Sequence, residues 1–300
     1  MGDEYEPYEW QVGDPEDWGD SIGTPDIPYM GYLNNDDDER PPDNNHKTDK
    51  ASILSDEAWR LRNEERYNEA LVLINQAIES NPHHSNHLNR KAIILEDMRR
   101  YEEALCFYDK ALAVSKSKVI SNNKAQCILT LLKIKLGKYD RNDLNLINDA
   151  LKILPDDTDN NPFLHMKGDI LTKLGEPVKG RICYYLAGKM FDEVETAEKQ
   201  LKILQDSNET FINITGTNHY QNFKPFNKET VVDLVKEPTN KYDKDAIRVE
   251  ISGKTVGYVA NSDYTLIKEV KSASEIKNTS STKAKVLFVL LETYIIAKLI

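Results

Sequence analysis

A repeat of 34 residues is the sequence feature that most constrains the fold of this chain. The positions that recur at this interval carry aromatic or small side chains: Tyr67 and Tyr101, Ala70 and Ala104, Ala77 and Ala111. This interval, with apolar residues at helical spacing, predicts stacked helical hairpins that each bury an apolar face against their neighbours. The two alanines of each copy lie two turns apart on one helix face, where small side chains let a second helix approach closely.

The repeated sequences are Arg-Tyr-Asn-Glu-Ala-Leu at 66–71 and Arg-Tyr-Glu-Glu-Ala-Leu at 100–105, and they resemble the tetratricopeptide repeat. Two less regular copies follow, the second of which has Gly168 and Ala187 at the expected positions. The resemblance spans 51–205 and implies a helical solenoid whose groove holds a protein or peptide partner. It also implies that the recurring residues, with Gly168 and Ala187, pack the hairpins together. An amphipathic stretch at 193–204 is expected to cap the last repeat.

From residue 206 the hydrophobic pattern changes to that of β-strands. Residues 246–251 alternate between apolar and charged side chains, and Ser252-Gly253-Lys254 reads as a tight turn into the next strand. Strands are predicted at 211–214, 231–235, 246–251 and 255–259, with one or two more within 283–299. A helix is predicted from an N-cap at 261–263 to about Ala273. The sequence therefore predicts an α+β multidomain chain, in which an all-α solenoid precedes a small β-barrel at 206–300.

Four motifs in this C-terminal region resemble the HIRAN domain. They are Gly216-Thr-Asn-His-Tyr220, Val231-Val-Asp-Leu-Val-Lys-Glu-Pro238, Asn240-Lys-Tyr-Asp-Lys-Asp-Ala-Ile247 and Val256-Gly-Tyr-Val259. The resemblance covers about 210–300 and implies an OB-like β-barrel. A DNA-binding member of this family grips the 3′-hydroxyl end of single-stranded DNA, which makes such an end the implied ligand.

The resemblance implies a nucleic-acid site made of aromatic, polar and basic residues: His219, Tyr220, Asn240, Lys241, Tyr242, Asp243, Lys244 and Tyr258. In this site Tyr242 would stack on a base, and Asp243 would hold a terminal hydroxyl. Asn240 would bond a base edge or a sugar. The lysines, together with Lys236, Arg248 and Lys254, would be available to meet phosphates.

This chain departs from the DNA-end-binding member at three places, at one of which Ala260-Asn261 stands where a basic residue is expected. Asn218-His219 stands where that member has Arg-Tyr, and Tyr258 stands where it has His. These changes keep aromatic surface but remove positive charge. An alternative interpretation is therefore open, in which Asn240 and Asp243 only form a turn, Tyr242 is a core residue, and the domain contacts proteins alone.

Charge is distributed unevenly along the chain. Residues 1–50 hold 15 acidic and three basic side chains, a net charge of -12, whereas residues 210–300 hold 13 basic and 10 acidic ones, a net charge of +3. The acidic balance of the whole chain, -11, therefore does not exclude a nucleic-acid partner. The first 50 residues, poor in aliphatic side chains, are expected to be a disordered acidic tail that carries aromatic residues; the alternative is a short segment that docks these aromatic side chains onto a partner or onto the repeats.

The remaining patterns predict a soluble, cytoplasmic, non-catalytic protein. Cys106, Cys127 and Cys183 form no CxxC pair, and the apolar run at 286–300 is too short and too charged for a membrane span. No secretory signal is recognised. No phosphate-binding loop, nucleophile or metal motif stands out, so no enzyme, cofactor or metal is expected. Two functions remain: an adaptor that recruits a protein partner to DNA ends in repair or processing, and a scaffold for protein–protein interaction without nucleic acid.

Overall fold

The computed structural model describes residues 50–300 except for 157, 221–225 and 263–265. The acidic segment predicted to be disordered lies outside the described residues. Residues 48–300 belong to one compact unit. The helices that precede the barrel are α1 (Lys50–Asn63), α2 (Tyr67–Ser80), α3 (Ser85–Asp97), α4 (Tyr101–Val114), α5 (Lys118–Ile134), α6 (Arg141–Ile153), α7 (Asn161–Lys173), α8 (Pro177–Ala187) and α9 (Phe191–Asp206).

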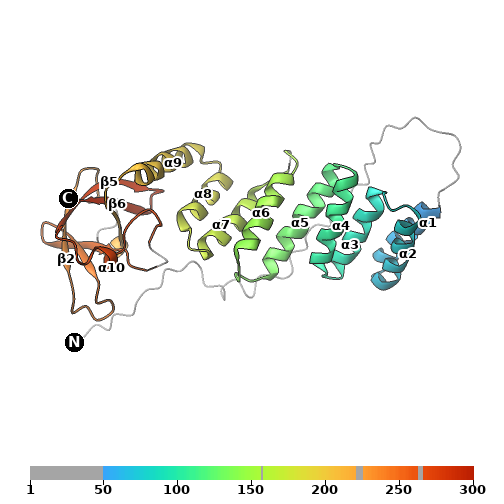
Figure 1. Cartoon of the computed structure of the whole chain (residues 1–300), viewed down its shortest axis with the longest axis horizontal. Coiled ribbons are helices and arrows are strands. Elements are labelled where there is room, and N and C mark those ends of the chain that lie inside the picture. The colour runs from blue at the N-terminus through green and yellow to red at the C-terminus, as the bar shows by residue number, and fades with distance from the viewer. Residues whose placement is uncertain (1–49, 157, 221–225, 263–265) are drawn as a thin grey trace. The chain divides into compact units, whose positions relative to one another are not determined.

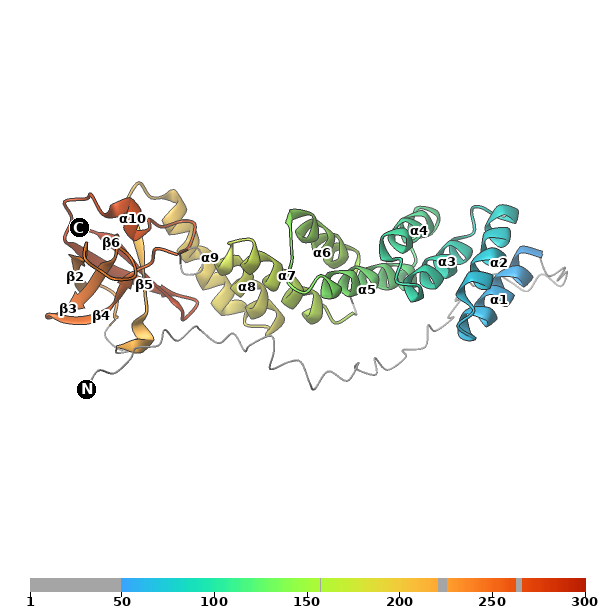
Figure 2. The ribbon, with the colours of Figure 1, turned by 90° about the horizontal axis from the view of Figure 1, so that it is seen from below.

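These helices form a solenoid of tetratricopeptide-like hairpins. Each helix contacts the next in chain order, and α1, α3, α5 and α7 also contact one another in succession (Figures 1 and 2). The structure buries Ala70 and Ala77 of α2, and Ala104 and Ala111 of α4, completely. A stripe of alanines on the second helix of a hairpin lets the first helix approach closely, which is why these repeats stack.

Polar contacts between residues 34 or 35 positions apart join successive repeats. Arg62 Nε on α1 lies 2.5 Å from Asp97 Oδ2 on α3, and Asn123 Nδ2 on α5 donates to Asn89 Oδ1 on α3 over 3.3 Å. The third hairpin departs from the regular spacing because α5 has 17 residues, where α1 to α4 have 13 or 14. The longer α5, together with the longer connection from α5 to α6 (135–140, against 98–100 between α3 and α4), accounts for the irregular third copy in the sequence.

Glycine sets the crossing of α7 and α8. A Cβ atom on Gly168 would lie 2.4 Å from the Tyr184 ring, and one on Gly180 would lie 2.7 Å from the backbone oxygen of Gly168. No side chain fits at these distances, so only glycine permits this approach of the two helices. Ala187, at the end of α8, is buried, as are Tyr101 and most of the apolar residues that face between hairpins.

Six antiparallel strands close into a barrel after α9. They are β1 (Phe211–Thr215), β2 (Val231–Lys236), β3 (Ile247–Ile251), β4 (Lys254–Val259), β5 (Lys283–Leu290) and β6 (Tyr294–Leu299). Their order around the barrel is β1-β4-β3-β2-β5-β6, so β1 lies between β4 and the C-terminal strand. All the predicted strands are present, and each of the six described strands pairs with two neighbours, as a closed barrel requires.

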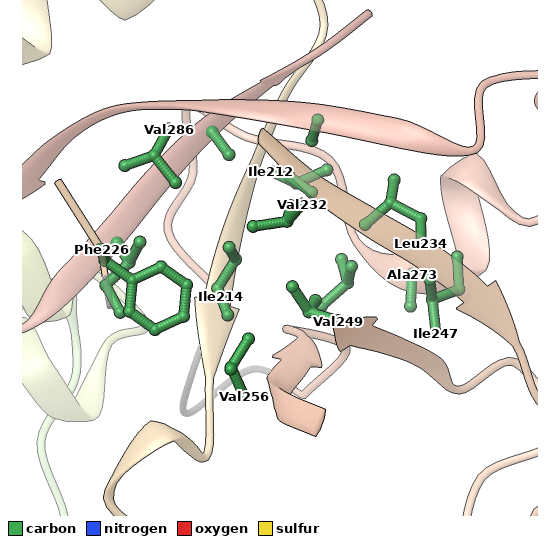
Figure 3. Close-up of a cluster of buried hydrophobic side chains, with 14 of the residues drawn as sticks. Ile212, Ile214, Phe226, Val232, Leu234, Ile247, Val249, Val256, Ala273 and Val286 are labelled. Atoms are coloured by element: carbon green, nitrogen blue, oxygen red, sulfur yellow. The ribbon is translucent and has the colours of Figure 1, made fainter. Parts of the chain in front are cut away.

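The barrel core consists of the inward-facing residues of these strands (Figure 3). Ile212, Val232, Val249 and Val286 are fully buried in it, and Ala273 contributes from the short helix α10 (Ala273–Ile276). The helix predicted to run from 261–263 to about Ala273 is wrong, because the described residues between 266 and 272 are not helical. The helix begins instead after Ser272, whose side chain forms a capping box with Glu275.

The solenoid and the barrel share a second hydrophobic core. Val178 of α8 and Ala197 and Leu204 of α9 are buried together with Phe211 of β1 and Leu290 of β5. The hydroxyl of Tyr185 on α8 also donates to the backbone oxygen of Leu291 over 3.3 Å. Helix α9, predicted as a cap of the solenoid, therefore also covers one side of the barrel. Within the described part of the chain, every helix falls short of the length and apolar character needed to cross a membrane.

Candidate nucleic-acid interface

The residues predicted to contact nucleic acid come from three segments of the barrel. His219 and Tyr220 lie at the end of a 3₁₀ turn (Thr217–His219) after β1, Asn240 to Lys244 lie in the loop between β2 and β3, and Tyr258 lies on β4. Strand pairing sets Tyr258 opposite Thr215 of β1 on one side and opposite Arg248 of β3 on the other. The structure thus brings Tyr258 beside the other two segments.

Close packing of β1 and β4 requires glycine before Tyr258. A Cβ atom on Gly257 would lie 2.6 Å from the backbone oxygen of Thr215 and 2.9 Å from the Ile214 side chain. Any larger residue would separate the two strands. The Val-Gly-Tyr sequence of β4 therefore fixes where the tyrosine ring stands relative to the 3₁₀ turn.

The rings of Tyr220 and Tyr258 form the aromatic part of this surface. Their centroids are 6.5 Å apart at an interplanar angle of 45°, and 42 % of Tyr220 is exposed. Burial, followed by the neighbouring Tyr220 and the Glu237 carboxylate, raises the pKa of Tyr258 to about 12. Tyr258 therefore keeps its proton at neutral pH and acts as a hydrogen-bond donor. His219 is exposed beside them.

Glu237, directly after β2, connects the β2–β3 loop, β3 and β4. Its Oε2 accepts hydrogen bonds from Asn240 Nδ2 over 2.9 Å and from the Tyr258 hydroxyl over 3.3 Å, and its Oε1 pairs with Arg248 Nη1. The Arg248 guanidinium also donates from Nε to Glu250 Oε1 over 2.8 Å. Arg248, expected to be available for phosphates, is thus held between two carboxylates.

The loop between β2 and β3 is folded by its own side chains. Asn240 Oδ1 accepts from the backbone N–H groups of Tyr242 and Asp243 over 3.0 and 3.1 Å. Asp243 Oδ1 accepts from the backbone of Asp245 over 2.9 Å, and its Oδ2 accepts from Asn261 Nδ2 over 2.8 Å. Asn240 and Asp243 therefore have a role in the loop itself, and Asp243 keeps further acceptor capacity, since a carboxylate accepts about four hydrogen bonds.

Tyr242 projects from this loop with 79 % of its surface exposed, so it is not a core residue. Lys241 Nζ lies 5.6 Å from the centre of its ring. Among the described residues, neither Lys241 nor Lys244 has an acidic side chain within ion-pair distance, whereas Lys277, Lys285 and other barrel cations do. The loop thus presents an exposed aromatic ring with Lys241 beside it, and Lys244 two residues further along the chain.

Sequence reasoning missed Glu237, Glu250 and Asn261 as members of this site. Asn261 holds the loop to the following segment, because its Oδ1 also accepts from the backbone of Ser274 over 2.9 Å. The only sequence signal for Glu237 was its place in the Glu-Pro step of the second motif. Its role depends on strands that meet only once the barrel closes.

The barrel has a relative among known families. Residues 207–275 match the HIRAN domain family, and this range contains β1 to β4 and all the predicted nucleic-acid residues. Strands β5 and β6, which follow the matched range, pair with β2 and β1 and close the barrel. None of the curated proteins compared with the chain matches it.

Two solved structures are similar to the chain at low identity. MamA 41-end from Desulfovibrio magneticus RS-1 is 17 % identical, with a TM-score of 0.32 over 53 % of this chain and 98 % of its own. The MamA RS-1 ArsTM double mutant is 17 % identical, with a TM-score of 0.33 and the same coverage. The assignment of the repeats rests on the helical hairpins and the 34-residue spacing of this chain. The chain therefore carries tetratricopeptide-like helical repeats followed by a HIRAN domain.

Proposed function

We propose that the chain is a non-catalytic adaptor that brings a protein partner to nucleic acid, with single-stranded DNA bearing a free 3′ end as its ligand. The helical repeats would bind the protein, and the HIRAN domain would bind the strand. Recruitment of this kind suits DNA repair or processing in the cytoplasm. The observation that carries the proposal is the exposed Tyr242 ring with Lys241 5.6 Å from its centre, on a loop that Glu237 ties to Tyr258 of the Tyr220–Tyr258 pair.

The chemistry of this surface suits a single strand. Exposed aromatic rings stack on any base, and unpaired lysines contact the backbone phosphates. Among the described residues of the β2–β3 loop, Lys241 and Lys244 are the cations without an ion pair, and so few charges favour a short contact with a strand end over a long track along a duplex. Asp243 would accept a hydrogen bond from a terminal hydroxyl and repel a terminal phosphate.

A scaffold that binds only proteins is the second candidate. It is favoured by Asn240 and Asp243, which already serve to fold their own loop, and by the two carboxylates that neutralise Arg248. Under this alternative Tyr242 would be an anchor for a protein partner, since exposed tyrosines are common in such contacts.

Fluorescence anisotropy with the full chain separates the two candidates. We expect tighter binding of a short oligonucleotide with a 3′-hydroxyl than of the same oligonucleotide with a 3′-phosphate. Asp243→Ala should reduce this preference while much of the affinity remains. Equal affinity of the wild-type chain for both oligonucleotides would contradict the role of Asp243. Absence of binding to either oligonucleotide would exclude the nucleic-acid function and favour the scaffold that binds only proteins.

A further inference from the structure

Three hydrogen-bond donors from separate segments of the barrel converge on one carboxylate. Arg248 of β3 pairs with Glu237 Oε1, while Asn240 of the β2–β3 loop and Tyr258 of β4 donate to Oε2 over 2.9 and 3.3 Å. We call Arg248, Asn240 and Tyr258 the cradle. A guanidinium, an amide and a phenol around one point are the donors with which proteins hold carboxylate and phosphate oxygens.

Glu237 therefore occupies a site that would otherwise suit an external anion. Glu237 and Arg248 also cancel each other's charge, and Glu250 adds a second carboxylate 2.8 Å from Arg248 Nε. The arginine that pairs with Tyr258 across β3 and β4 consequently offers no net positive charge to a ligand.

We propose that the cradle is a phosphate site held closed by Glu237, and that a backbone phosphate of a bound strand takes the place of the Glu237 carboxylate. This inference rests on the nucleic-acid function proposed above. The phosphate would lie beside the Tyr220–Tyr258 rings, which are available for the neighbouring bases. Glu237 thereby limits both the affinity of the site and its dependence on salt.

Only a side-chain movement is needed to open the cradle. The backbone of Glu237 is fixed, because its N–H donates to the Ala246 oxygen over 2.9 Å. Its side chain is 19 % exposed and that of Arg248 is 31 % exposed, so the ion pair reaches the solvent. Ion pairs open to water are weak enough for a competing anion to replace one partner.

Glu237→Gln in the full chain tests the proposal, because glutamine keeps the shape of the side chain and removes its charge. We expect affinity for a short single-stranded oligonucleotide to rise roughly tenfold at low salt, the usual worth of one charged hydrogen bond. The slope of log affinity against log salt should steepen by about 0.7, as for one more phosphate contact on a single strand. A further Arg248→Gln substitution should cancel both gains.

Glu250→Gln is the matched control. Like Glu237→Gln, it removes one carboxylate charge beside the Arg248 guanidinium, but Glu250 does not contact Asn240 or Tyr258. A general effect of net charge would raise affinity equally in both variants, whereas an opened cradle raises it mainly in Glu237→Gln. Glu237→Asp adds a test at constant charge: the shorter carboxylate no longer reaches all three donors, so affinity should also rise.

Inorganic phosphate tests the cradle without nucleic acid. At constant ionic strength, millimolar phosphate should raise the melting temperature of Glu237→Gln and leave that of the wild-type chain and of Glu250→Gln unchanged. Phosphate binding by Glu237→Gln in the absence of any oligonucleotide binding would support the cradle and contradict the nucleic-acid function. If Glu237→Gln and Glu250→Gln bind oligonucleotide and phosphate equally, or Glu237→Gln binds less tightly than the wild type, the proposal is wrong.

Discussion

Glu96 on α3 is partly buried within the repeats, and the hydroxyl of Tyr108 on α4 donates to its Oε2 over 2.9 Å. Burial is the main cause that raises the pKa of Glu96 to about 7, and the neighbouring Asp97 adds to it. In the folded chain this carboxyl therefore keeps its proton at pH values where an unfolded glutamate, with a pKa near 4.5, has lost it. Stability from this group is fully present below about pH 4.5 and is lost as the pH rises through about 7.

Glu96→Gln should therefore stabilise the protein at alkaline pH, because glutamine imitates the protonated carboxyl. Between pH 5 and pH 8 we expect the wild type to lose roughly 2–3 kcal/mol of unfolding free energy relative to this variant. Chemical denaturation at the two pH values measures the difference. Glu79→Gln, on the exposed side of α2, is the control and should show no such change. A pH response that is the same in both variants would mean that Glu96 ionises freely in the folded state.

Some residues of the candidate site could be predicted from the sequence, whereas their contacts across strands could not. Tyr242, Lys241 and Lys244 were predicted as ligand contacts from the resemblance of the loop sequence to the HIRAN domain, and the structure shows that Tyr242 is exposed and not in the core. The contacts of Glu237 with Arg248 and Tyr258 were not predicted. They join residues 11 and 21 positions apart on strands whose register is set only in the closed barrel.

Among the elements, the helices of the repeats follow directly from sequence, because alanine positions decide where two helices can cross. Ala104 of α4 is fully buried, whereas Ala113 on the same helix is exposed. Ala104→Leu should overpack this crossing and cost about 1–3 kcal/mol of unfolding free energy. Ala113→Leu, the same change on the exposed face, should cost little. Chemical denaturation of both variants tests which face of α4 packs against the neighbouring helices. Equal stabilities would show that the Ala104 face does not form the close crossing.

The strands were predicted well and the helix after β4 was not. Alternation of apolar and charged residues in 247–251 gives a clear period of two, which fixes the inward face of β3. Asn261-Ser262-Asp263 is a good N-cap sequence, but the Asn261 side chain is used by Asp243 and by the backbone of Ser274. A tertiary contact thus overrides a local signal, and Ser272 caps the helix that forms instead.

In the molecule as a whole, α9 joins the solenoid to the barrel through the core that it shares with β1 and β5. Ala197 and Leu204 of α9 contact this core, and Phe211, Leu290 and Ile296 of the barrel are buried in it. A barrel cut free of α9 would expose these apolar side chains to water, at a cost of about 25 cal/mol for each Å² of apolar surface. The two parts are therefore expected to depend on each other for stability.

Truncation tests this dependence. Residues 207–300 alone should unfold at a lower temperature than residues 161–300, which keep α7, α8 and α9, and should associate through the exposed apolar face. Thermal unfolding and size-exclusion chromatography compare the two. Equal melting temperatures with a monomeric 207–300 would show that the barrel does not need the helices.

Binding of single-stranded DNA by the full chain tests the central claim most directly. Fluorescence anisotropy at low salt should show binding by the wild type, and Tyr242→Ala should weaken it by about 1–3 kcal/mol, the worth of one base–aromatic stack. Phe191→Ala is the control, since Phe191 is also an exposed aromatic residue, 61 % accessible, but stands at the start of α9. It should bind as the wild type does. No binding by the wild type at tens of micromolar protein, or equal binding by Tyr242→Ala and Phe191→Ala, would contradict the account.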